Sequence, residues 1–400
     1  EIRPLEQYSC AQPTGGGLRV AWLTWHHSTG TPNRSQYIRG DLLARAAGSL
    51  CSRVRAAATV AFVEERPGAK ALQPHVGFAE LRRFAASHGG LDACVEVKVF
   101  FAERHELCRA LGAQIFIDVI DNKPFLQWAT SRKAADADDA RLLALRKRDV
   151  TLVVQTEHLA THLRRLRLNA VVIPHHHTNA LGWGIRPLQR RGPDEPLRVV
   201  FLASRDTVGT VGAEISPAVC AGGATLLVVV QKGASHQTLQ SSRETCHCNG
   251  TQTKLKVDTP SAMNKLDDPH QQNLFFIDEA SKDADLAVVW PTHAGWFLER
   301  PPTRMLYWWS RGIPTIHSQM YSYIEIAEKE HYGAGAGLSL EAKDVHDLSR
   351  VLREVRPEGV RKILREEVLR AAEHYNTSSI AQMFVDEIRT TVLRNGNGGT

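Results

Sequence analysis

The chain of 400 residues lacks the features on which several classes of protein depend. Its seven cysteines are too few for the disulfide scaffold that holds small secreted domains together. Its longest apolar runs, such as residues 224–230, are far shorter than the roughly 20 residues of a membrane-spanning helix. We therefore expect no membrane span in this chain and a fold that is stabilised by apolar cores.

Motifs for several cofactors and ligands are also missing. No Gly-X-Gly-X-X-Gly follows the first apolar run and no P-loop is present, which argues against dinucleotide redox chemistry and against a Walker-type ATPase. Cys246-His-Cys248 has no second pair at ligand spacing, so we expect no metal site. The net charge is +6, but its Lys and Arg are scattered and form no nucleic-acid recognition module, so we expect no nucleic-acid partner.

Apolar runs of strand length alternate with helical stretches, and this pattern is typical of an α/β fold. In the first half the expected strands cover residues 18–25, 58–63, 95–101, 115–120, 151–155 and 170–173. Residues 181–196 show neither the helical nor the strand spacing of apolar residues and are interpreted as a linker. After the linker, strands are expected at 197–203, 225–231, 273–277, 286–290 and 313–316. A polar insertion at 235–272 is expected to be a surface loop.

This alternation of strands and helices predicts two Rossmann-like domains that face a central cleft. The first covers residues 1–180 and the second 197–370, and a helix in 371–400 is expected to cross back onto the first. Ligands of open parallel sheets bind beyond the carboxyl ends of the strands. The loops at those ends carry the candidate residues His26, Asp118, His175, His176, Arg205 and Thr292.

Residues 299–316 carry the most specific signal. Pro301 and Pro302 favour the start of a helix, and they place Thr303 and Arg304 where backbone donors bind anions. Helical spacing puts Arg304, Tyr307 and Arg311 on one face, and it puts Met305, Leu306, Trp308 and Trp309 on a second face that is expected to pack in the core. Gly312 is expected to cap the helix.

These residues resemble the retaining, metal-independent group of glycosyltransferases with the B-type fold (GT-B). In that group a Glu, seven residues and a second Glu precede a short helix and Gly-X-Pro; here Glu299 holds the first position, Tyr307 the second, and Gly312-Ile-Pro314 follows. The segment Arg300-Pro-Pro-Thr-Arg304 resembles the basic variant of the same loop. The resemblance implies that Glu299 contacts the donor sugar and that Thr303 and Arg304 contact the diphosphate, with Arg300 as a further substrate- or nucleotide-binding candidate.

The function implied by the resemblance is the transfer of a hexosyl or pentosyl group from a nucleotide sugar to a glycan or another hydroxyl acceptor. The donor is a substrate, so no cofactor is expected. The first domain would hold the acceptor and the second the nucleotide sugar. The catalytic candidates are Glu299, His175 and Asp118, although for Asp118 the helix-cap interpretation is favoured. Arg205, Thr292, Tyr307, His176 and His26 are the further binding candidates.

Two other interpretations stay open. The clustered histidines suit a nucleotide-sugar epimerase of the same fold, and Tyr307 at the position of the second carboxylate suits an inactive glycan- or nucleotide-binding relative. Three Asn-X-Ser/Thr sequons, at Asn33, Asn249 and Asn376, favour the secretory route and the Golgi lumen, with the cytoplasm as the alternative. The sequence gives no indication of the oligomeric state.

Overall fold

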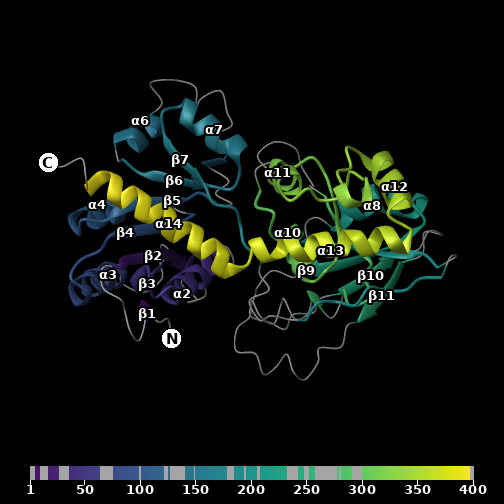
Figure 1. The fold of residues 1–400 in the computed structure, drawn as a ribbon, viewed down its shortest axis with the longest axis horizontal. Helices are drawn as coiled ribbons and strands as arrows, with labels where there is room; N and C mark the ends of the chain where they lie inside the picture. The colour runs from purple at the N-terminus through teal and green to yellow at the C-terminus, as the bar shows by residue number, and fades with distance from the viewer. Residues whose placement is uncertain are drawn as a thin grey trace. The chain divides into compact units, whose positions relative to one another are not determined.

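The computed structural model describes most of the chain (Figure 1). The described residues are 5–9, 17–26, 36–63, 75–98, 101–120, 125–126, 140–147, 149–177, 184–192, 195–204, 208–231, 242–246, 252–256, 277–278, 281–290 and 300–396. The chain forms two compact units, each described by itself. The first comprises Glu1–His176, Glu299–Pro301 and Asn376–Thr400, and the second comprises His177–Leu298 and Pro302–Tyr375.

The first unit contains a seven-stranded sheet in the order β1-β3-β2-β4-β5-β6-β7. Neighbouring strands are parallel except for β1, which pairs antiparallel with β3. The strands are β1 (Leu5–Ser9), β2 (Leu18–His26), β3 (Val54–Val63), β4 (Ala93–Val97), β5 (Gln114–Asp118), β6 (Thr151–Val154) and β7 (Asn169–Val172). The helices are η1 (Tyr37–Asp41), α2 (Leu42–Gly48), α3 (His75–His88), α4 (Ala102–Ala110), α6 (Ala140–Lys147), α7 (Glu157–Arg165) and α14 (Thr377–Gly396).

The strand order explains where the last helix packs. From β2 to β3 the chain steps toward one edge of the sheet, and from β3 through β4 to β7 it steps toward the opposite edge. Because these crossovers are right-handed, α2 lies on one face of the sheet and the later crossover helices lie on the other. A single crossover helix would leave much of the α2 face uncovered. Helix α14 contacts both α2 and β5, so it covers this face with residues from the carboxyl end of the chain (Figure 1).

The second unit contains a six-stranded sheet in the order β11-β10-β9-β8-β12-β13. Its strands are β8 (Leu197–Ser204), β9 (Ala224–Gln231), β10 (Ser242–Cys246), β11 (Gln252–Lys256), β12 (Leu286–Val289) and β13 (Thr315–His317). Its helices are α8 (Val208–Ala221), α10 (Thr303–Ser310), α11 (Tyr321–Lys329), η5 (Ala334–Ala336), α12 (Val345–Glu354) and α13 (Glu358–His374). Helix α8 packs with α12, and α10 packs with α13.

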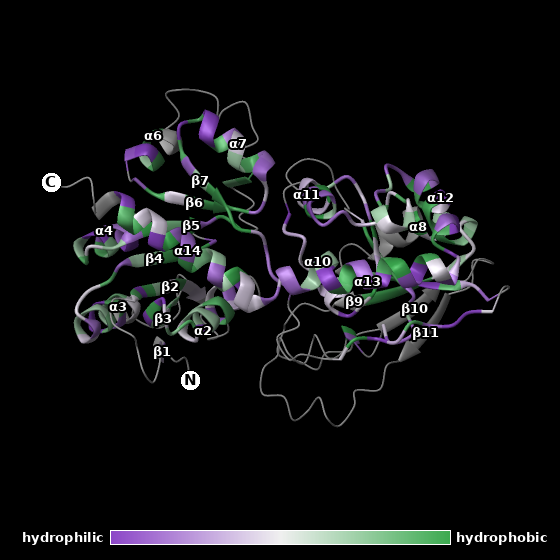
Figure 2. Ribbon diagram, viewed as in Figure 1, coloured by the Kyte–Doolittle hydropathy of each residue, from purple (hydrophilic) through white to green (hydrophobic). Residues whose placement is uncertain are grey.

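Apolar side chains gather on the strands of both sheets, and the helices alternate polar and apolar residues (Figure 2). Strands β4 and β6 are buried along their whole length, as are β12 and β13. Continuous burial is what a parallel sheet with helices on its faces requires. The α/β prediction is therefore confirmed. No helix in the described part of the chain combines the length and apolar character needed to cross a bilayer.

Two local predictions were wrong, and one strand was missed. Within the expected surface loop at 235–272, β10 and β11 form an antiparallel hairpin on the edge of the second sheet. Ile277, expected to end a strand, forms a helical turn with Asp278 instead. Strand β1 was not predicted at all. Each of these segments is short and polar or mixed, so its structure depends on a neighbouring strand or helix more than on its own periodicity.

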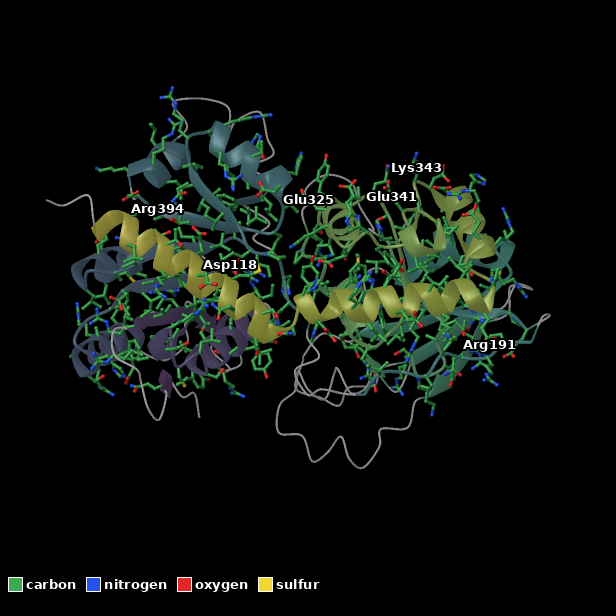
Figure 3. The ribbon with its side chains drawn as sticks, in the orientation of Figure 1. Asp118, Arg191, Glu325, Glu341, Lys343 and Arg394 are labelled. Atoms are coloured by element: carbon green, nitrogen blue, oxygen red, sulfur yellow. A yellow bond between two sulfur atoms is a disulfide. The ribbon has the colours of Figure 1, made fainter. Side chains whose placement is uncertain are left out.

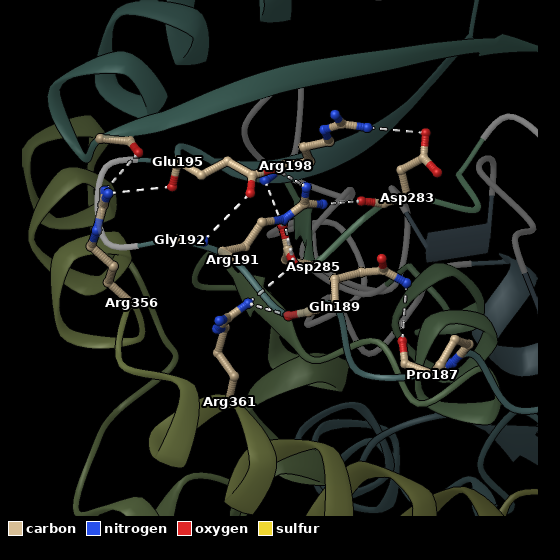
Figure 4. A network of polar contacts seen from close by, with 11 residues as sticks. Pro187, Gln189, Arg191, Gly192, Glu195, Arg198, Asp283, Asp285, Arg356 and Arg361 are labelled. Carbon is tan, nitrogen blue, oxygen red and sulfur yellow. Dashed lines mark hydrogen bonds and ion pairs between the residues drawn. The ribbon is translucent and has the colours of Figure 1, made fainter.

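Arginines attach the irregular segment 184–192 to the second unit (Figure 4). Arg191 pairs with Asp285 at 3.0 Å, and it also donates a hydrogen bond to the carbonyl of Asp283 at 2.8 Å. Arg361 of α13 reaches the same Asp285 at 3.1 Å. The backbone N–H of Arg198, at the start of β8, donates to Asp285 at 2.7 Å. One carboxylate just before β12 thus joins the segment, α13 and β8.

The first unit depends on a fully buried ion pair between Arg39 and Asp118. Figure 3 labels the Asp118 side chain. Arg39 Nε donates to Asp118 at 2.6 Å, and Arg39 Nη1 donates to the carbonyl of Pro174 at 2.9 Å. The Arg39 guanidinium also lies 4.8 Å from the ring centre of Phe384 in α14. Burial raises the pKa of Asp118, and the adjacent guanidinium opposes that shift.

Asp118→Asn should lower the free energy of unfolding of the first unit by about 3 to 5 kcal/mol, because it leaves the Arg39 charge buried without its carboxylate. Urea denaturation together with hydrogen exchange of the β5 amides measures the effect. Asp386→Asn is the matched control, since its exposed pair with Arg53 should be worth less than about 1 kcal/mol. Equal losses in the two variants would contradict the central role of the buried pair.

Candidate functional site

The amino end of α10 is the described part of the predicted anion site. The helix starts at Thr303, and Pro302 occupies the N-cap position with no side chain capping the end. No acidic residue lies in the first turn, and Thr303 and Arg304 are half-buried. The helix dipole and the basic side chain of Arg304 therefore combine to make this end electropositive. Such an end suits a phosphate group.

The rest of α10 is buried all round, which corrects the prediction of a polar face. Trp308 and Trp309 are core residues as expected, and Trp309 Nε1 donates to Thr315 Oγ1 at 2.9 Å. Tyr307 and Arg311, however, are only 3% and 2% exposed. The reason is that α10 packs on β12 and β13 and also against α13. Tyr307 lies edge-on to Trp308, so its predicted nucleotide contact would have to come from a core side chain.

Several predicted site residues lie outside the described part of the structure. These are Glu299, Thr292 and Arg205, and the side chain of His26 at the end of β2. Their assignments stay predictions, as does that of Arg300, whose half-buried side chain is described. Among the described residues of the second unit, the two predicted diphosphate contacts, Thr303 and Arg304, therefore lie together in the first turn of α10.

Strand β13 ends in a buried pair of polar residues that the sequence analysis missed. His317 is buried, and its Nδ1 lies 3.1 Å from the carbonyl oxygen of Ser318. Burial lowers the pKa of His317, so the ring is neutral at physiological pH. Ser318 is 5% exposed, and its hydroxyl finds no hydrogen-bond partner within the described structure. Both residues follow the strand expected at 313–316, so the rule that located the other loops would also have selected them.

The histidines after β7 are held by hydrogen bonds. His176 Nε2 donates to the carbonyl of Ile38 at 2.8 Å, since a carbonyl only accepts, and its Nδ1 is 3.2 Å from the hydroxyl of Thr377. His175 is 1% exposed, with Nδ1 2.6 Å from the His176 carbonyl, and the two rings stack at 5.2 Å. These contacts fix the β7 end against η1 and α14. Catalytic or binding roles for the two side chains stay predictions.

Asp118 occupies a structural position in the same unit. Both of its carboxylate oxygens have partners, because Oδ2 accepts from Arg39 and Oδ1 accepts from the backbone N–H of Ile120 at 3.2 Å. The second bond resembles the capping interaction that the sequence suggested. Among the described residues, no three His, Cys, Asp or Glu side chains are placed to hold a metal ion.

Comparison with known proteins gives structural likeness alone. Neither a family model nor a curated protein sequence matches the chain. A glycosyltransferase from Rickettsia africae ESF-5 superposes with a TM-score of 0.52 at 8% identity, over 94% of this chain and 99% of that one. An E. coli structure described as trehalose-6-phosphate bound with UDP-2-fluoro glucose gives 0.50 at 10% identity, over 92% and 98%. At such identities the likeness shows the fold: the chain has the GT-B fold of glycosyltransferases.

The half-buried His177 should make the protein sensitive to acid. Burial lowers the pKa of His177 to about 4, whereas an unfolded histidine titrates near 6.5. The unfolded chain then binds more protons between these values, so the stability that neutral His177 contributes is full above pH 6.5 and is lost as the pH falls toward 4.

His177→Asn should therefore narrow the difference in melting temperature between pH 7 and pH 5. Thermal denaturation followed by circular dichroism at the two pH values measures this difference. The exposed His346 is the matched control, and His346→Asn should leave the difference unchanged. An unchanged difference in the His177 variant would contradict the assignment of a buried neutral ring.

Proposed function

We propose that the protein is a glycosyltransferase that moves a hexosyl or pentosyl group from a nucleotide-diphosphate sugar to a hydroxyl of a glycan or another acceptor, with retention of configuration. The observation that carries the proposal is the uncapped amino end of α10, with Thr303 and Arg304 in its first turn, in a chain with the GT-B fold. The predicted roles of Glu299, Arg205 and the other site residues belong to this proposal.

The chemistry requires electrostatic stabilisation more than a covalent helper. The bond between the anomeric carbon and the diphosphate breaks, a bond from that carbon to the acceptor oxygen forms, and the acceptor proton passes to the leaving diphosphate. Negative charge builds on the leaving oxygens. The positive end of α10 and the Arg304 guanidinium are placed to stabilise it, because fixed dipoles and charges need no reorganisation during the reaction.

A neighbouring structure supports the choice of a nucleotide-diphosphate sugar as the donor. The E. coli structure with the same fold is described as bound with UDP-2-fluoro glucose. A uridine diphosphate sugar is therefore the first donor to test here. The proposal needs no metal or organic cofactor, since the donor already carries its activating group.

Incubation with a panel of nucleotide sugars and hydroxylated acceptors tests the function. We expect release of nucleoside diphosphate that depends on the acceptor, together with a new glycosidic product. Interconversion of the sugar without an acceptor would support the epimerase instead. Binding of nucleotide with neither reaction would support an inactive relative, which Tyr307 at the second carboxylate position makes the main competing interpretation.

Arg304→Ala should weaken the binding of a nucleoside diphosphate by about 1.5 to 3 kcal/mol, the usual value of a hydrogen bond to a charged group. Isothermal calorimetry with UDP measures the affinity, and circular dichroism checks the fold. Arg350→Ala is the matched control, since Arg350 lies exposed on α12 and pairs with Asp347 and Glu354. Equal UDP affinity in wild-type protein and the Arg304 variant would exclude the diphosphate contact.

We also propose that the protein acts in an oxidising compartment of the secretory route. A disulfide joins Cys94 of β4 to Cys108 of α4, and Cys51 and Cys220 are disulfide-bonded as well. Disulfides persist in such compartments and are rare in the cytosol. The three sequons, at Asn33, Asn249 and Asn376, favour the same location.

Expression with a secretion signal in mammalian cells tests the disulfide on which the proposed location rests. Peptide mapping without reduction should recover the Cys94–Cys108 cross-link, and Cys94→Ser with Cys108→Ser should lower the free energy of unfolding by about 3 kcal/mol for a loop of this size. Free thiols at both positions in the secreted protein would overturn the proposal. Arg55→Gln, an exposed substitution on β3, serves as a control for the stability measurement.

A further inference from the structure

Helix α4 buries few apolar side chains for a helix that covers a sheet. Its buried side chains are those of Arg104, His105, Leu107 and Cys108, so Leu107 is the one aliphatic side chain among them. Phe101 holds the N-cap position and provides no side-chain hydrogen bond to the first turn. Isolated helices of nine residues are marginal in water, and in proteins their stability comes mostly from an apolar face. Another interaction must therefore hold α4 in place.

Helix α7 has the attachment that α4 lacks. It also has nine residues, and it buries Leu159, Ala160 and Leu163. Thr156 caps its amino end, because the Thr156 side chain accepts a hydrogen bond from the backbone N–H of Leu159 at 3.1 Å. Each of the two helices connects neighbouring parallel strands, so the right-handed rule places both on the same face of the sheet. The helices thus differ in what attaches them to that face.

Polar contacts attach the amino half of α4. Glu96 of β4 is 0% exposed; it accepts from Arg104 Nη1 at 3.3 Å and also from His105 Nε2. The Arg104 guanidinium lies 4.0 Å from the ring centre of Phe62 and 4.2 Å from that of Phe101. The desolvation of buried charges offsets most of their attraction, so such a pair adds little net stability. His105 Nδ1, buried without a hydrogen-bond partner in the described structure, lowers the net gain further.

A covalent bond attaches the other half of α4. Cys108 forms a disulfide with Cys94 of β4. Linking two segments raises the effective concentration of one for the other, so contacts that are weak by themselves are enough to keep them together. Cys94 and Cys108 are 0% and 1% exposed, and thiol–disulfide exchange requires access to a sulfur. The docked helix therefore shields the bond that holds it.

We propose that the Cys94–Cys108 disulfide is a redox switch that decides whether α4 docks on the sheet. In the reduced chain, Leu107 and the polar contacts to Glu96 are too weak to hold the helix, and α4 is released. A small disulfide such as glutathione disulfide is the oxidant. The two cysteine thiols give up two protons and two electrons to it, the bond between their sulfurs forms, and the oxidant leaves as two thiols. Helix α4 then docks and buries the new bond.

The switch acts on the edge of the sheet where parallel α/β sheets bind ligands. Strand β4 ends at Val97 and α4 begins at Ala102, so the first turn of α4 lies at the carboxyl edge. Release of the helix would also uncover the Glu96 carboxylate. The chain should therefore gain full activity only after it has met an oxidising compartment. This effect on activity rests on the proposed function, whereas the release of α4 does not.

Hydrogen exchange of the full chain, followed by mass spectrometry, tests the switch. In Cys94→Ser with Cys108→Ser, the α4 amides should exchange within about 10-fold of the rate of an unstructured peptide, while the α7 amides stay protected by roughly 100-fold or more. Cys51→Ser breaks another disulfide of the first unit and is the matched control; it should leave α4 as protected as in the wild type. Equal protection of α4 and α7 in the double variant would overturn the inference.

A single variant gives a second measurement. Cys108→Ser leaves the thiol of Cys94 as a probe, and a released α4 should let iodoacetamide label it in the folded protein. A thiol that reacts only after denaturation would show that α4 stays docked without the disulfide, and this would contradict the switch. Loss of α7 protection in the same variant would also overturn it, because the disulfide would then hold the whole unit and not one helix.

The proposed function fails by a different result. Release of α4 in the double variant, together with a wild-type protein that transfers no sugar from any nucleotide sugar, would leave the switch and exclude the transferase. Sugar transfer by the wild type, together with a docked α4 in the double variant, would leave the transferase and exclude the switch. Exchange and transfer assays on the same two proteins therefore distinguish the two failures.

Discussion

The buried pair of Arg39 and Asp118 is the interaction on which the first unit depends. A guanidinium taken out of water is tolerated only when its charge and its N–H groups all find partners. Here the partners come from the ends of β5 and β7, and α14 supplies the ring of Phe384. The charge of Arg39 can be satisfied only when these segments are together, so the pair makes the carboxyl edge of the sheet a rigid platform.

The second unit uses a carboxylate in the same manner. Asp285 accepts from Arg191, from Arg361 and from the backbone N–H of Arg198 (Figure 4). It lies one residue before β12, the strand that leads toward the α10 helix. Rigidity at the amino end of β12 therefore supports the strand whose opposite end carries the candidate phosphate site. In each unit a charge cluster holds the framework, and in the second unit the chemistry is proposed for a different group, the amino end of α10.

Long periodic segments were predictable from the sequence, because continuous apolar runs leave few alternatives to a buried parallel strand. The core positions of Trp308 and Trp309 followed from the same reasoning. The burial of Tyr307 and Arg311 did not, since it depends on α13 packing from the second side, which no local period reveals. The unpaired hydroxyl of Ser318 was equally invisible, because a missing partner is a property of the folded surroundings and not of the residue.

The place of α14 in the first unit has a consequence for how the protein is made. The first unit needs residues that a ribosome adds only after the whole second unit, since Phe384 and the rest of this 20-residue helix follow residues 177–375 in the sequence. Until α14 has been made, the face of the first sheet that α2 covers therefore lacks its second helix. A chain truncated after residue 375 would keep the second unit and would have a first unit that exposes apolar strands to chaperones and proteases.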